Sequence, residues 1–75
     1  MADLTLDTSG LNCPLPILKT KKALSSVPVG GTLEVLATDP GAEADFVAFC
    51  QATGNVLVES GSAGSTTRFL IRRTS

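Results

Sequence analysis

The residues of this chain that could carry out chemistry gather in one segment, residues 10–16, which reads Gly-Leu-Asn-Cys-Pro-Leu-Pro. Prolines are tolerated in the first turn of a helix, because the N–H groups of that turn have no helical partner. The two prolines therefore predict a helix that starts at Cys13, with its sulfur accepting a hydrogen bond from the Leu15 N–H. The positive end of such a helix favours thiolate over thiol and makes a cysteine nucleophilic.

An exposed thiolate with no acid or base beside it suits the transfer of a group by thiol exchange, and sulfane sulfur held as a persulfide is the simplest such group. Lys19, one turn further along, adds positive potential if its side chain folds back. The alternative is that Cys13 is a small buried residue at a turn stiffened by proline. The second cysteine, Cys50, falls on an apolar stripe beside Phe46 and Phe49, which predicts a core thiol.

The composition excludes several classes of function. The chain has no His, so it has neither a histidine-based triad nor a histidine-ligated metal site, and we expect no metal and no resident cofactor. Its net charge of -1 argues against direct binding of nucleic acid. With 75 residues, 43% of them hydrophobic, we expect one domain, 1–75, without an enclosed pocket. The sequence shows neither a signal peptide nor a membrane-length apolar run, which predicts a cytoplasmic protein without membrane contact.

Hydrophobic periodicity and turn residues predict six elements. The expected strands and helices, in chain order, are strand 4–7, helix 13–26, strand 32–38, helix 39–53, strand 55–60 and strand 66–73, with a hairpin loop at 61–65. Asp39 is the predicted N-cap of the second helix with Pro40 at its first position, and Gly54 is its predicted C-cap.

This order predicts a two-layer α/β (α+β) sandwich, βαβαββ, in which two helices cover one face of a mixed four-stranded sheet. The residues expected in the core are Ile17, Thr20, Leu24, Val27, Leu33, Val35, Ala37, Ala42, Phe46, Phe49, Cys50, Thr53, Val56, Val58, Phe69 and Ile71. The helix-free face is expected to carry Leu36, Leu57 and Leu70 among polar residues. These leucines form either a docking patch or singly exposed apolar residues.

The chain resembles the TusA-like (SirA) family of sulfur carriers along essentially its whole length. The resemblance is carried by the Cys-Pro-x-Pro run in residues 10–16 together with segments 21–24, 38–40, 45–46, 49–50 and 69–73. It implies the βαβαββ sandwich. It also implies that Cys13 accepts sulfur as a persulfide from a cysteine desulfurase or rhodanese and passes it to a DsrE-type acceptor.

The resemblance further implies that Pro14 and Pro16 position the sulfur, in addition to the Leu15 N–H expected to donate to it, and that Asp39 and Pro40 are structural. At Asn55 the chain departs from relatives that often have His after the glycine. The pathways that the family serves include tRNA thiolation, cofactor assembly and sulfur oxidation. The chain is expected to act as a monomeric carrier with sulfurtransferase-type chemistry rather than as a stand-alone enzyme.

Two other classes of function remain open on the sequence. One is a non-catalytic regulatory or interaction module, which would dock through the sheet face or through the basic helix that carries Lys19, Lys21 and Lys22; the alternative for these lysines is a solvated helix face. The other is a sulfurtransferase that acts on small molecules, which a shallow surface site disfavours. The reactivity of the Cys13 thiol distinguishes a carrier from a docking module.

Overall fold

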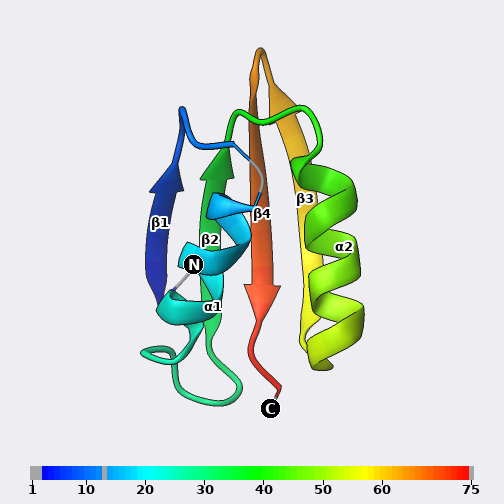
Figure 1. The fold of residues 1–75 in the computed structure, drawn as a ribbon. Helices are drawn as coiled ribbons and strands as arrows, with labels where there is room; N and C mark the ends of the chain where they lie inside the picture. Colours follow the sequence, from blue (N-terminus) through cyan, green and yellow to red (C-terminus); the bar gives the residue numbers. More distant parts are fainter. Residues whose placement is uncertain (1–2, 13, 75) are drawn as a thin grey trace.

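The computed structural model describes residues 3–12 and 14–74 and shows a four-stranded sheet with both helices on one of its faces (Figure 1). The elements, in chain order, are β1 (Leu4–Thr8), α1 (Leu15–Leu24), β2 (Thr32–Ala37), α2 (Ala42–Thr53), β3 (Val56–Ala63) and β4 (Thr66–Arg72). The predicted two-layer architecture and mixed sheet are confirmed.

The sheet has the strand order β1-β2-β4-β3, so the last strand inserts between β2 and β3. β1 and β2, joined through α1, are parallel, whereas β4 is antiparallel to both of its neighbours. Phe69 and Ile71, on β4, are fully buried, which explains why this strand takes a central position. The carboxyl ends of β1 and β2 consequently meet at one edge of the sheet, where the segment that leads into α1 begins.

The core lies between the inner sheet face and the two helices. Phe46 of α2 stacks on Phe69 of β4 with ring centroids 4.4 Å apart, a geometry that adds to the free energy gained from burial. The buried hydrophobic residues are Leu24, Val27, Leu33, Val35, Ala37, Ala42, Phe46, Cys50, Phe69 and Ile71. All ten belong to the predicted core set, and Thr20, also predicted, is fully buried as well.

The prediction for the third strand was wrong about which side chains face inward. Val56 and Val58 are exposed, and Leu57 packs against the core instead. Leu57 pairs with the buried Ile71, and residues directly opposite each other share a face of the sheet. A β-bulge between Leu57 and Glu59 leaves Val58 outside the regular pairing, so strict alternation along this strand fails.

The segment 61–65, predicted as a loop, is mostly strand. β3 continues to Ala63, and the hairpin closes through Gly64, whose φ is 64°, and Ser65. Small residues dominate this segment, yet cross-strand pairing with Thr66, Thr67 and Arg68 holds it in the ladder.

Both helices start later than expected. α1 begins at Leu15 with Pro14 at the N-cap, rather than at Cys13, and it ends at Leu24. α2 begins at Ala42 with Gly41 at the N-cap. Asp39 forms the turn that precedes α2, because its carboxylate accepts a hydrogen bond from the Gly41 N–H (3.3 Å). The predicted C-cap is confirmed, since Gly54 has a φ of 79° and donates to the Cys50 carbonyl.

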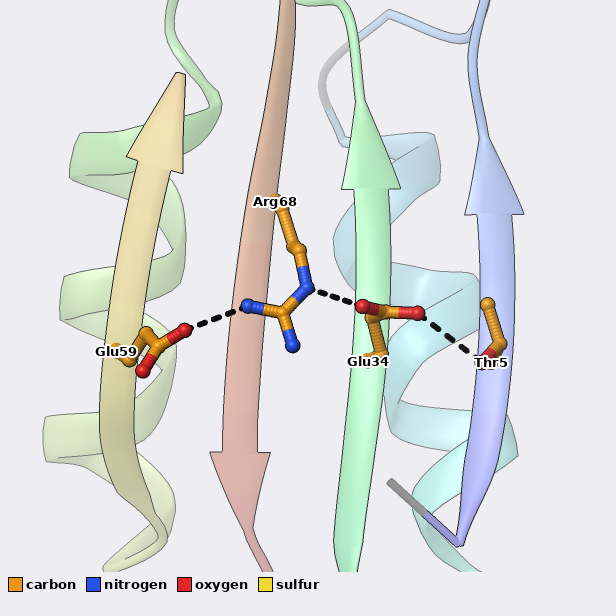
Figure 2. Close-up of polar contacts among 4 residues, drawn as sticks. All are labelled: Thr5, Glu34, Glu59 and Arg68. Carbon is orange, nitrogen blue, oxygen red and sulfur yellow. Dashed lines mark hydrogen bonds and ion pairs between the residues drawn. The ribbon is translucent and has the colours of Figure 1, made fainter. Parts of the chain in front are cut away.

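The helix-free face of the sheet carries a polar network that crosses all four strands (Figure 2). Arg68 of β4 pairs with Glu34 of β2 and, at 2.7 Å, with Glu59 of β3, while Thr5 of β1 donates to Glu34. Arg68 is the main cause that lowers the pKa of Glu34, and Glu34 in turn raises the pKa of Arg68. Charged side chains therefore lie between the half-buried Leu36 and Leu70 on this face.

Candidate functional site

The segment between β1 and α1 is fastened to the end of β2 by two threonines. Thr8, fully buried at the end of β1, donates its hydroxyl to the Leu36 carbonyl (2.6 Å). Gly10 donates its N–H to the hydroxyl of Thr38, just beyond β2 (2.8 Å). These bonds join the chain before residue 13 to the edge where the two parallel strands end.

A glycine is required at position 10 for a conformational reason. Its φ is 82°, in the left-handed region that L side chains rarely adopt, and a Cβ there would contact nothing within 4 Å. The turn is closed by the Leu11 N–H, which donates to the Thr8 carbonyl (3.1 Å). The carboxylate of Asp7 accepts from the Ser9 N–H (2.9 Å), and hydrogen bonds from the side chain and backbone of Ser9 lower its pKa.

The expected nucleophile, Cys13, lies outside the described residues. The residues on both sides of it, Asn12 and Pro14, are exposed. The predicted hydrogen bond from the Leu15 N–H to the sulfur of Cys13 therefore also lies outside the described residues. The Leu15 N–H donates to the Asn12 carbonyl (2.8 Å), and the helix begins two residues later than expected. One backbone hydrogen bond, from Leu11 to Thr8, therefore lies before residue 13, and a second one, from Leu15 to Asn12, joins the residues before and after it.

The two prolines of the motif have different surroundings. Pro14 is the exposed N-cap, whereas Pro16, in the first turn, is buried against the sheet side of α1 together with Thr20 and Leu24. Pro16 thus anchors the helix start to the core. Lys19 is exposed one turn beyond Leu15, on the helix that also carries Lys21 and Lys22 near its C-terminal end.

Sequence reasoning missed three parts of this region. Thr8 and Thr38 hold the segment through hydrogen bonds of their hydroxyl groups, which the hydrophobic periodicity of the sequence does not indicate. Leu18, 55% exposed, stands beside the 45% exposed Leu15 on the first turns of α1. Its position off the stripe of Thr20 and Leu24 was the available signal for an apolar residue on the outer surface.

Cys50 is a buried free thiol with 4% of its surface exposed, and burial raises its pKa. This confirms the predicted core thiol, and it makes Cys50 a poor nucleophile. Within residues 3–12 and 14–74, no three His, Cys, Asp or Glu side chains are grouped so that they could hold a metal ion. Neither helix in this part of the chain has the length and apolar character needed to cross a membrane.

Comparison with known proteins agrees with this arrangement. Residues 4–73 match the family described as "Sulfurtransferase TusA". The chain is 54% identical over 71 residues to the sulfur carrier protein TusA of Allochromatium vinosum, covering 95% of this chain and 93% of that one. It is 38% identical over 73 residues to the sulfur carrier protein TusA of Pseudomonas fluorescens, covering 97% and 88% of the two chains.

The fold has a solved counterpart in the crystal structure of a SirA-like protein from Desulfitobacterium hafniense. The two structures superpose with a TM-score of 0.82 at 23% identity, covering 96% of this chain and 99% of the other. The family match spans every helix and strand and includes the segment that holds the Cys-Pro-x-Pro motif. The chain therefore belongs to the TusA family of sulfur carrier proteins.

Proposed function

We propose that the chain holds sulfane sulfur as a persulfide on Cys13 and relays it from a donor protein to an acceptor protein in the cytoplasm. The observation that carries this proposal is the fastened, exposed segment around residue 13, which hydrogen bonds tie to the ends of β1 and β2. It is supported by relatives whose names describe sulfur carrier proteins. The donor is of the cysteine desulfurase or rhodanese type, and the acceptor is of the DsrE type.

Loading is an exchange of one sulfur atom between two thiols. The Cys13 thiolate attacks the terminal sulfur of the donor persulfide, a bond forms between these two sulfurs, and the bond between the two sulfurs of the donor breaks. The donor cysteine leaves as a thiolate, and the proton of the persulfide remains on the transferred sulfur. Unloading repeats the exchange with an acceptor thiolate, so neither step needs an added oxidant or reductant.

The chain has no His, and the larger partners supply whatever proton transfer the exchange requires. The positive end of α1 favours the thiolate at Cys13, and the exposed Lys19 adds positive charge near that end. Pro14, Leu15 and Pro16 position the sulfur through the helix start. The acceptor determines whether the sulfur serves tRNA thiolation, cofactor assembly or sulfur oxidation.

The test is to incubate the purified protein with a sulfur donor and to measure its intact mass. The parent and Cys50→Ser gain the mass of one sulfur atom, which a thiol reductant then removes. Cys13→Ser gains none. Equal uptake by Cys13→Ser and the parent contradicts the proposal, and Cys50→Ser controls for the loss of a thiol as such.

A further inference from the structure

Positive charge is concentrated along α1. Lys19, Lys21 and Lys22 lie on the helix, and Arg73 lies against its C-terminal end. None of the seven Asp and Glu residues of the chain falls within Leu15–Leu24. The chain as a whole has a net charge of -1, so this helix presents a local field opposite in sign to the overall charge.

A surface groove with a volume of about 260 Å³ opens at the C-terminal ends of α1 and α2. Leu24 and the half-buried Phe49 provide its apolar part. Its polar part consists of Lys21, Ser25, Thr53, Asn55 and Arg73, and no carboxylate is among the described residues that line it. A ligand that fits this lining has an apolar group next to an anionic one.

The structure holds the polar part of the groove in place. The Arg73 guanidinium donates to the carbonyls of Leu24 (3.1 Å) and Val27 (2.6 Å), which places its charge at the end of α1. The Asn55 side chain accepts from the Thr74 N–H (3.0 Å) and donates to the Thr53 hydroxyl (2.9 Å). The exposed Lys21 at the mouth of the groove supplies a charge on a side chain that can follow a ligand.

The size and position of the groove favour a protein segment over a free small molecule. Small-molecule sites usually enclose about 300 to 1,000 Å³ and bury most of the ligand, and this groove is smaller and open to solvent. Leu18, Lys21 and Ser25 follow helical spacing along one side of α1, so an exposed stripe connects the first turns to the groove. The rise from Leu15 to Lys21 is about 9 Å.

One partner can cover both ends of this stripe. A protein interface of ordinary size buries about 800 Å² on each side, and the whole chain measures only 30 × 24 × 18 Å. A protein that binds the segment around residue 13 for sulfur exchange is therefore large enough to contact Leu18 and the groove as well.

We propose that the groove docks an acidic segment of the protein that exchanges sulfur with this chain, an inference that rests on the proposed function. One carboxylate of the segment pairs with Lys21, and a neighbouring apolar side chain packs on Leu24 and Phe49. Docking in the groove determines which partner protein binds, while the exchange of sulfur takes place at the other end of α1.

The test uses nuclear magnetic resonance of the ¹⁵N-labelled full chain, titrated with the peptide acetyl-Leu-Glu-Glu-Leu-amide. The expected result is saturable shifts of the amides of Lys21, Leu24, Ser25, Phe49 and Asn55. A control peptide with Gln in place of both Glu residues binds at least about fivefold more weakly, because it lacks the negative charge. The proposal would be overturned by the absence of saturable shifts or by equal binding of the two peptides. Amide shifts of equal size at every Lys and Arg of the chain would overturn it as well.

Two matched pairs of variants locate the contact. Lys21→Glu weakens the binding of the acidic peptide by about fivefold or more, whereas Lys22→Glu, the same charge change on an exposed neighbour outside the groove, changes it less than about twofold. Ser25→Trp fills the groove and blocks binding, and Ser26→Trp does not. Equal effects within either pair would overturn the assignment. Loading of Cys13 by inorganic polysulfide is measured on the same variants: its failure in the parent contradicts the proposed function instead.

Discussion

At the scale of single residues, the two prolines after Cys13 have separate tasks. Pro16 is buried at the start of α1, whereas Pro14 is exposed at the N-cap. A buried ring contributes to the free energy of folding, and an exposed one contributes mainly by restricting the unfolded chain. In the proposed relay, Pro16 is the structural anchor of the motif, and Pro14 is the residue proposed to position the sulfur of Cys13.

Replacing each proline with alanine tests this division. Pro16→Ala lowers the free energy of unfolding by about 1 to 2 kcal/mol, because buried methylene groups are lost. Pro14→Ala lowers it by about 0.5 kcal/mol but slows the loading of sulfur. Urea unfolding and the rate of mass gain measure the two effects. Equal losses of stability, together with parental loading by Pro14→Ala, would contradict the division.

At the scale of elements, the bulge in β3 decides which side chains reach the core. Leu57 faces inward opposite Ile71, whereas Val56 and Val58 face solvent with 46% and 45% of their surfaces exposed. The prediction that Leu57 lies on the helix-free face is accordingly wrong. The outer face retains Leu36 and Leu70, with the Arg68 network between them.

Truncation of the two neighbours checks the register of this strand. Leu57→Ala lowers the free energy of unfolding by about 1 to 2 kcal/mol, because its side chain packs against the core. Val58→Ala changes it by less than about 0.5 kcal/mol, since the valine is exposed. Chemical denaturation measures both values, and a larger loss for Val58→Ala would show that the strand alternates without a bulge.

The ion network on the outer face makes the stability of the sheet dependent on pH. Arg68 holds the pKa of Glu34 below its ordinary value. Glu34 therefore stabilises the folded state at pH values above its ordinary pKa, and this stabilisation is lost as the pH falls through the lowered pKa. The urea midpoint of Glu34→Gln is therefore below that of the parent at neutral pH, and the difference between the two midpoints shrinks as the pH falls below the ordinary pKa of Glu34. Glu59→Gln shows a smaller difference, since Glu59 is the more exposed partner. A difference in urea midpoint between Glu34→Gln and the parent that stays the same in acid would exclude this role for Glu34.

At the scale of the whole molecule, the sequence was sufficient for the architecture because its core pattern is regular. Leu33, Val35 and Ala37 alternate with more exposed neighbours, and Thr20 and Leu24 follow helical spacing, as found in the structure. The bulge at Val58 was not predictable, because its side chain is apolar in either register. The late start of α2 has a similar cause, since Asp39 can cap a turn as readily as a helix.

The candidate site was predictable as a motif but not as a set of contacts. The spacing of Cys13, Pro14 and Pro16 indicated where the proposed sulfur exchange takes place. The bonds from Thr8 and to Thr38 join residues that are 28 positions apart, and local patterns carry no information about such pairs. The groove beside Lys21 likewise forms only when α1, α2 and the chain after β4 come together.

The proposed role of Cys13 and the burial of Cys50 together predict that the two thiols of the chain differ in reactivity. In the native protein, iodoacetamide modifies Cys13, while Cys50 is modified only after global unfolding, because it is buried and burial raises its pKa. Labelling followed by peptide mass analysis, with and without urea, measures this. Modification of Cys50 in the native protein at a rate similar to Cys13 would contradict a core position.

The central claim is that sulfur passes through Cys13, and the most direct measurement follows labelled sulfur through a reconstituted relay. A donor charged with isotopically labelled sulfane sulfur is mixed with the chain and then with an acceptor, and peptide mass spectrometry is performed over time. The account predicts that the label appears first on the peptide containing Cys13 and then declines as the acceptor gains it. Undiminished transfer to the acceptor in the presence of Cys13→Ser, or label that never resides on Cys13, would contradict it.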